Sequence, residues 1–204
     1  MRLPEIPPRV GPAVVAAAAV VLAVLMHRPL LGGLTTVVPG EPGSDVLRAL
    51  WSTWLVGQEL PGWPFGTTLA GFPEGLDLLP FPAVSLLLAA PFARLLGPIA
   101  AVDLIVLGHA VFAVLATAAL VRTLGGRWGA ALLAGVVVAT QPVLGGALRD
   151  GTLEVLAVGW VPLTLLSMVR ACRGERYWGP IAGMAFLATC LESVYYGSFT
   201  ALGV

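Results

Sequence analysis

The sequence predicts an all-α membrane protein, a polytopic bundle of about five transmembrane helices with amphipathic or re-entrant helices in its first loop. Of its 204 residues, 58% are hydrophobic and 11% are charged, whereas a soluble domain carries about 25% charged residues. The mean hydropathy is +0.93, and five stretches approach the roughly 20 apolar residues that cross a bilayer. A lipid bilayer is therefore the expected environment.

The whole chain, residues 1–204, is predicted to form a single membrane module. Its spans are expected at residues 13–34, 98–121, 128–145, 153–169 and 178–202. Arg2 and Arg9 precede the first apolar run, as in a signal peptide, but the segment from His27 to Leu30 lacks the small residues of a cleavage site. We therefore expect the first span to be retained.

A shorter apolar stretch, residues 81–97, decides the topology. Cytoplasmic loops concentrate arginine and lysine, and if this stretch does not cross the bilayer, seven arginines lie inside and four outside. The inner set is Arg2, Arg9, Arg122, Arg127, Arg170, Arg173 and Arg176, and the outer set is Arg28, Arg48, Arg94 and Arg149. If it crosses, the balance reverses. The sequence therefore predicts a cytoplasmic N-terminus, an extracytoplasmic loop over residues 35–97, and a re-entrant or interfacial helix over 81–97.

A second helix is expected in that loop, over residues 44–60. Ser44 can cap a helix whose first residue is Asp45. The apolar side chains then fall on one stripe, which comprises Leu47, Leu50, Trp51, Trp54 and Leu55. Arg48, Ser52 and Thr53 fall mostly elsewhere. Such a helix is typical of the membrane interface.

Asp45 is the first candidate catalytic residue. A helix N-terminus favours the ionised carboxylate, which is thereby expected at a defined place on the outer surface. A carboxylate there can accept a proton from an acceptor hydroxyl as general base, or it can help to bind a divalent cation. The alternative is that Asp45 only starts the helix.

The second outer loop, "GGALRDGTLE", is also acidic. Asp150 and Glu154 are four residues apart and share a face if the helix has begun, and Arg149 beside them can bind a phosphate. The alternative is that Asp150 or Thr152 caps the fourth span while Arg149 reaches the lipid headgroups. We expect both acidic loops on the same face, near enough to share a pocket, with Asp45, Asp150 and Glu154 as candidate ligands of Mg²⁺ or Mn²⁺.

Asp103, His109 and Glu192 lie within predicted spans, where ionisable groups are costly and usually face a cavity. A cavity open to the outer face would account for them. Tyr195 and Tyr196 add hydroxyl groups beside Glu192, so these three residues join Arg149 as candidate substrate or phosphate ligands. The alternatives are an interfacial position with water access for Asp103 and an ordinary hydrogen-bonded bundle residue for His109.

Several segments resemble the N-terminal part of bacterial polytopic membrane glycosyltransferases of the GT-C class. They are "GSDVLRALWSTWL", "FPEGLDLLPFPAVSLLLAAPFARLLGP", "AVDLIVLGHAVFAVLATAALVRTLGG", "TQPVLGGALRDGTLEVLAVGWVPLTLL" and "ESVYYG". The resemblance implies transfer of a sugar from a polyprenyl-phosphate carrier at the outer face of the bacterial cytoplasmic membrane. It places Asp45 at the base or metal position, and Asp150, with Glu154, at the assisting position.

The same resemblance implies further spans, so the chain is expected to be an N-terminal fragment. The sugar acceptor, whether glycan, lipid or protein, is left open. The residues alone are also compatible with two other functions. One is a transporter in which Asp103, His109 and Glu192 line the path. The other is a non-catalytic membrane scaffold.

Overall fold

The computed structural model describes residues 7–59, 66–67, 76–77 and 82–203. Within these residues the chain is almost entirely helical, with one antiparallel pair of two-residue strands, β1 (Gly66–Thr67) and β2 (Leu76–Asp77). The helices are α1 (Gly11–Met26), α2 (Arg28–Leu31), α3 (Val46–Glu59), α4 (Ala83–Leu96), α5 (Pro98–Thr123), α6 (Trp128–Ala139), α7 (Pro142–Asp150), α8 (Leu153–Leu156), α9 (Trp160–Cys172), α10 (Trp178–Glu192) and α11 (Val194–Leu202).

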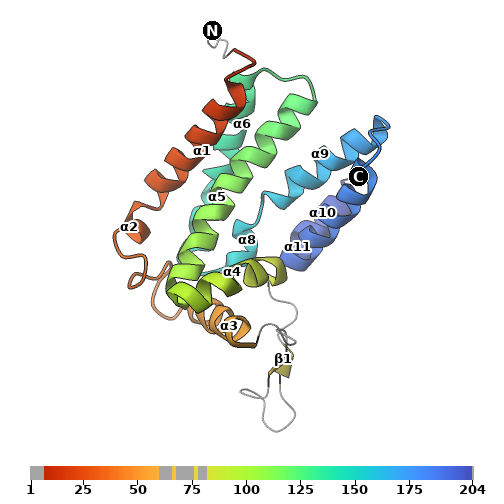
Figure 1. Ribbon diagram of the computed structural model, residues 1–204. Coiled ribbons are helices and arrows are strands. Elements are labelled where there is room, and N and C mark those ends of the chain that lie inside the picture. The colour runs from red at the N-terminus through yellow and green to blue at the C-terminus, as the bar shows by residue number, and fades with distance from the viewer. Residues whose placement is uncertain (1–6, 60–65, 68–75, 78–81, 204) are drawn as a thin grey trace.

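Helix α5 is the axis of the bundle (Figure 1). It contacts α1 and α6 on one side and α9 on the other, while α3 and α4 lie across its lower end. Small residues let its neighbours approach closely. A Cβ atom at Gly135 of α6 would lie 2.7 Å from the carbonyl oxygen of Val114, and one at Gly159 would lie 3.0 Å from the amide nitrogen of Ala113. The backbones on both sides of α5 therefore pack almost directly on it.

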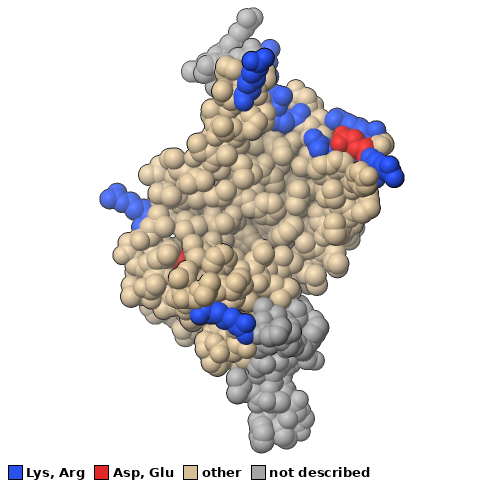
Figure 2. All heavy atoms as spheres, viewed as in Figure 1, with Lys and Arg blue, Asp and Glu red and all other residues tan. Residues whose placement is uncertain are grey.

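Among the described residues, three helical segments are long and apolar enough to cross a membrane, namely Pro98–Thr123, Trp128–Asp150 and Leu153–Cys172, and α1 and α4 are shorter apolar helices. The outward face of α1 is apolar too, since Val20, Val21 and Leu25 are all exposed. Figure 2 shows a broad surface without charged side chains in the centre and on the right of this face, with one basic and one acidic side chain visible toward its left edge. An exposed apolar surface of this kind fits a lipid bilayer. The number of five spans remains a prediction.

The described arginines of the predicted cytoplasmic set lie near the ends of helices, and Arg2 lies outside the described residues. Arg9 precedes α1, Arg122 and Arg127 flank the α5–α6 turn, and Arg170 lies in the last turn of α9. Arg122 lies 4.6 Å from the ring centre of Trp128 and Arg170 lies 4.4 Å from that of Trp178. Arginine stacked on tryptophan is typical of a membrane interface.

The first predicted span, 13–34, is wrong in its length. Helix α1 ends at Met26 after 16 residues, and His27 separates it from the single turn α2. The predicted spans 128–145 and 153–169 are also interrupted, because α6 gives way to α7 at Pro142 and α8 gives way to α9 after Leu156. Pro142 has no N–H to continue the ladder of α6, so it starts a new helix instead.

The fifth predicted span, 178–202, is a helical hairpin rather than one span. Ser193 is extended between α10 and α11. A Cβ atom at Gly197 would lie 2.7 Å from Sγ of Cys190 and 3.0 Å from its Cα. Residues seven positions apart cannot touch in this way along a continuous helix, so the chain folds back at Ser193.

We expect Gly197→Leu to destabilise this hairpin by about 1–3 kcal/mol, because the added side chain would overlap Cys190. The measurement is the free energy of unfolding of the purified protein in detergent. Gly183→Leu is the matched control, since its Cβ atom would meet nothing within 4 Å. Equal stability of the two variants would show that the hairpin contact is not tight.

Helices α3 and α4 fall where the sequence predicts helices, but α3 presents a different face. Helix α3 begins at Val46, and the Oγ atom of Ser44 has no hydrogen-bond partner in the described part of the chain, so the predicted Ser44 cap is wrong. Ser52 and Thr53 are buried, whereas Leu47 and Trp54 of the predicted apolar stripe are exposed. Within a membrane bundle small residues make the helix contacts and large apolar ones can face lipid.

Candidate functional site

The two acidic loops meet directly. The amide of Asp45 donates a hydrogen bond of 3.0 Å to the carbonyl oxygen of Asp150, and the amide of Glu41 donates one of 2.8 Å to the carbonyl oxygen of Arg149. The sequence-based prediction that the two loops lie close together is therefore confirmed, whereas the side of the membrane on which they lie stays a prediction. We call this contact the loop junction and define it as Glu41, Asp45, Arg48, Arg149, Asp150 and Glu154.

Glycine at position 151 makes the junction possible. Gly151 ends α7 in the left-handed conformation, with φ of +72°, where other residues are strained. A Cβ atom there would also collide with the backbone nitrogen of Val46. The turn after α7 can therefore lie against the start of α3 only because this residue has no side chain.

Charge pairs surround Asp45. Nη2 of Arg48 lies 3.4 Å from Oδ2 of Asp45 and 3.4 Å from Oε1 of Glu154, and Nε of Arg149 lies 2.6 Å from Oε1 of Glu41. The Asp45 side chain remains 57% exposed. Exposed ion pairs stabilise little, about 0–1 kcal/mol, so these contacts mainly orient the carboxylates while leaving Asp45 accessible.

The predicted metal ligands do not form a cluster. Across the ranges described above, no group of three or more His, Cys, Asp or Glu side chains is arranged to bind a metal ion. Arg48 contacts both Asp45 and Glu154, and Asp150 takes part through its backbone carbonyl. A guanidinium between two carboxylates supplies the positive charge that a cation would supply, so the residues do not fit Mg²⁺ or Mn²⁺ in this arrangement.

A cavity of about 330 Å³ opens beside the loop junction. Arg149 and Glu41 lie at its lining, and Met26 and His27 line it deeper in the bundle. Met26 and His27 also line an inner cavity of about 140 Å³. Two adjoining cavities therefore lead from the charged junction toward the bundle interior, with walls that are mostly apolar.

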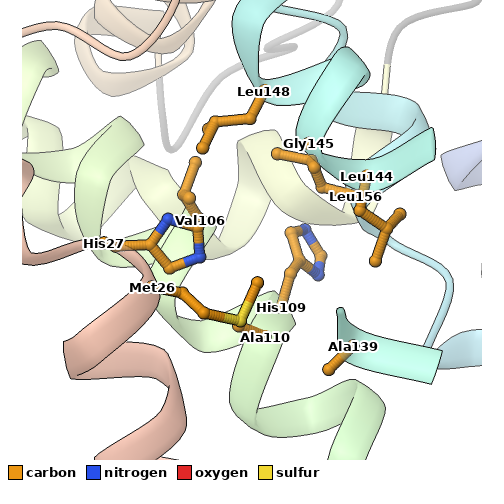
Figure 3. A pocket seen from close by; sticks show the side chains of 10 residues that line it. All are labelled: Met26, His27, Val106, His109, Ala110, Ala139, Leu144, Gly145, Leu148 and Leu156. Atoms are coloured by element: carbon orange, nitrogen blue, oxygen red, sulfur yellow. The ribbon is translucent and has the colours of Figure 1, made fainter. Parts of the chain in front are cut away.

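The inner cavity lies where three helices are interrupted (Figure 3). His27 separates α1 from α2, Ala139 ends α6 and Leu156 ends α8, and all three residues line the cavity. His109 projects into it from α5, and Nδ1 of His27 has no hydrogen-bond partner in the described structure. Irregular backbone at membrane depth is tolerated where it lines a cavity, which accounts for these breaks.

Glu192 lies in a separate, buried network. The amide of Ser85 donates to Oε1 of Glu192, Oγ of Ser85 donates to Oε2 at 2.8 Å, and Oγ of Ser85 lies 2.7 Å from Nε2 of His109. Glu192 is 2% exposed, Ser85 1% and His109 7%. Glu192 is thus fully hydrogen-bonded inside the bundle and does not line the cavity beside Arg149.

The tyrosines and Asp103 also differ from expectation. Tyr195 is exposed, and the hydroxyl of Tyr196 donates a hydrogen bond of 2.7 Å to the carbonyl oxygen of Val155. The structure therefore does not gather Glu192, Tyr195 and Tyr196 around Arg149. Asp103 is fully buried, and neither of its carboxyl oxygens has a hydrogen-bond partner in the described residues, so the alternative of an exposed interfacial position for Asp103 is wrong.

Sequence reasoning missed Ser85 and His27. Ser85 is a lone hydroxyl in the apolar run from Val84 to Ala90, and nothing in that run distinguishes it from a packing residue. His27 follows an apolar helix directly and drew attention only as part of a possible cleavage site. A signal was nevertheless present, because an imidazole at the end of a span is an unusual residue to place in lipid.

Comparison with protein-family models, curated proteins and solved structures found no match to this chain. The part of the chain that the structure describes is helical and includes three segments of membrane-spanning length and composition. Its distinguishing features are the loop junction at one end of the bundle and a polar network buried beside two cavities.

Proposed function

We propose that this chain is an integral-membrane glycosyltransferase, or the N-terminal module of one, which transfers a sugar from a polyprenyl-phosphate-linked donor. The supporting observation is the loop junction, in which an accessible carboxylate and an arginine are held together by two backbone hydrogen bonds between distant loops. The resemblance of the same loops to GT-C enzymes supplies the reaction class.

On this proposal Asp45 is the general base. The acceptor hydroxyl gives its proton to the Asp45 carboxylate, its oxygen bonds to the sugar carbon, and the bond from that carbon to the carrier phosphate breaks. Arg149 binds the phosphate in exchange for its pairing with Glu41, since a guanidinium fits phosphate as well as carboxylate. The apolar cavity beside Arg149 accommodates the start of the prenyl chain.

The test is sugar transfer by the purified full chain from a polyprenyl-phosphate-linked donor, compared between the unmodified protein and Asp45→Asn. If Asp45→Asn transfers sugar as fast as the unmodified protein, Asp45 is not the general base. Failure of the unmodified chain to transfer any sugar would exclude it as a complete glycosyltransferase and leave only the proposal of an N-terminal module.

We further propose that the loop junction lies on the extracytoplasmic face, with the N-terminus in the cytoplasm. Cys172 is exposed and ends α9, away from the junction. In intact cells, a membrane-impermeant maleimide is expected to label Asp45→Cys and Asp150→Cys, each in a Cys172→Ser, Cys190→Ser background. It should label Cys172 of the unmodified chain only after permeabilisation. If Cys172 is labelled in intact cells and positions 45 and 150 only after permeabilisation, the loop junction lies on the cytoplasmic face.

A membrane carrier is the second candidate. The network of Glu192, Ser85 and His109 supports it, because buried carboxyl and imidazole groups often mark transport paths. Flux of a solute in liposomes that persists in Asp45→Asn but stops in Glu192→Gln would favour the carrier over the transferase.

A further inference from the structure

Ser85 joins two ionisable side chains from other helices. It is the third residue of α4, so its amide is one of the first-turn donors without a partner inside the helix. That amide donates to Glu192 of α10, and the Ser85 hydroxyl contacts both Glu192 and His109 of α5. Two independent bonds therefore fix the Glu192 carboxyl against Ser85, and the hydroxyl links it to the imidazole.

The hydroxyl of Ser85 has one proton for two neighbours. It can donate to Glu192 while accepting from Nε2–H of His109, or donate to Nε2 of His109 while accepting from a protonated Glu192. The first arrangement pairs a carboxylate with an imidazolium, and the second pairs a carboxylic acid with a neutral imidazole. Both have zero net charge, so neither leaves an uncompensated charge in the buried site, which would be costly.

His109 connects this network to space in the bundle. Its imidazole lines the inner cavity of about 140 Å³ and a second cavity of about 280 Å³ bounded by Leu88, Phe112 and Trp160. A water molecule occupies about 30 Å³ in the liquid, so either cavity has room for water beside His109. Glu192, in contrast, lines neither of these two cavities, and Ser85 connects it to His109.

We propose that His109, Ser85 and Glu192 form a proton relay between the cavities and the interior of the bundle. A hydronium ion in the cavity water gives a proton to Nδ1 of neutral His109 and becomes water. The Nε2–H bond of the resulting imidazolium breaks, its proton bonds to Oγ of Ser85, and the original hydroxyl proton passes to Oε2 of Glu192. The products are a neutral His109 protonated at Nδ1, an unchanged serine and a carboxylic acid, so one proton has moved.

Helices α4, α5 and α10, which hold the relay, also carry Arg94, Asp103 and Cys190. Among the described residues of the elements that pack against these helices, the charged or titratable groups include Arg48 of α3, Glu154 of α8, Tyr196 of α11 and His27 after α1, whereas α9 carries Arg170 and Cys172 at its far end and α6 carries none. Glu154 is itself paired with Arg48.

The test follows both partners of the relay in the full chain in lipid nanodiscs. Infrared difference spectra over a pH series report the carboxylic acid of Glu192, assigned by its loss in Glu192→Gln. ¹⁵N NMR of labelled histidine reports His109, assigned by His109→Gln. In the unmodified protein we expect the protonation of Glu192 and the loss of the proton from Nε2 of His109 to occur at the same midpoint pH. Ser85→Ala should separate the midpoints by about one pH unit or more, and Ser85→Thr, which keeps the hydroxyl, should restore them.

Ser52→Ala is the matched control, because Ser52 is equally buried but its hydroxyl has no partner in the described residues. It should leave the common midpoint unchanged. If Glu192 and His109 change at different pH midpoints in the unmodified protein, the relay is wrong. This outcome needs no variant, so the proposal can be tested even if Ser85→Ala does not fold. A common midpoint that survives in a folded Ser85→Ala protein would overturn it as well.

Discussion

Replacing Asp45 with asparagine is expected to slow sugar transfer by about 100-fold to 10,000-fold, the usual contribution of a general base. The amide has the same size as the carboxylate but cannot accept the acceptor's proton. The backbone hydrogen bond from Asp45 to Asp150 does not involve the side chain, so the loop junction should persist. The measurement is the initial rate of transfer of a radiolabelled sugar by purified protein at saturating donor.

Glu175→Gln is the control for this prediction. Glu175 is an exposed acid that pairs with Arg170 after α9, so the substitution also neutralises one carboxylate of an exposed ion pair. It should leave the transfer rate unchanged. A rate for Asp45→Asn within about twofold of the control would mean that Asp45 serves only to begin α3 and to pair with Arg48.

The largest structural effect is expected from Gly151→Val. A β-branched residue in the left-handed region is strained by about 1–3 kcal/mol, and its side chain would collide with the start of α3, which adds about 1–3 kcal/mol. We expect the loop junction to separate and the free energy of unfolding to fall by about 3 kcal/mol. Chemical unfolding in detergent, followed by circular dichroism, gives this value.

Gly146→Val supplies the comparison, because Gly146 lies in the same helix and a Cβ atom there would meet nothing within 4 Å. Its stability should stay within about 1 kcal/mol of the unmodified protein. If Gly151→Val is no less stable than Gly146→Val, then α7 and α3 are not held together by the contact described here.

The loop junction was predictable because arginine positions carry topological information. Placing four arginines outside put both acidic loops on one side of the bilayer, and the hydrogen bonds between Asp45 and Asp150 and between Glu41 and Arg149 agree with that placement. The helices 44–60 and 81–97 were also predictable, from an amphipathic pattern and a short apolar run. The roles assigned to these residues remain predictions, since only chemistry can test them.

The helix breaks could not be read from hydropathy, because apolar residues continue on both sides of Ser193 and of Thr140. The face of α3 was also predicted wrongly, since an apolar stripe does not say whether lipid or protein covers it. The buried network of Ser85, His109 and Glu192 could not be predicted from the sequence for another reason. Ser85 is separated from His109 by 24 positions and from Glu192 by 107, and only packing of α4, α5 and α10 brings them together.

The interruptions around the inner cavity have a mechanical consequence. Helix α5 passes His109 without a break, whereas α1, α6 and α8 each stop beside it. A helix without its ladder of hydrogen bonds at one level bends there at little cost. We therefore expect the bundle to bend at the level of His109, where α5 is continuous and the segments that hold α2 and α7 can tilt against the rest. A change in bilayer thickness would change this tilt.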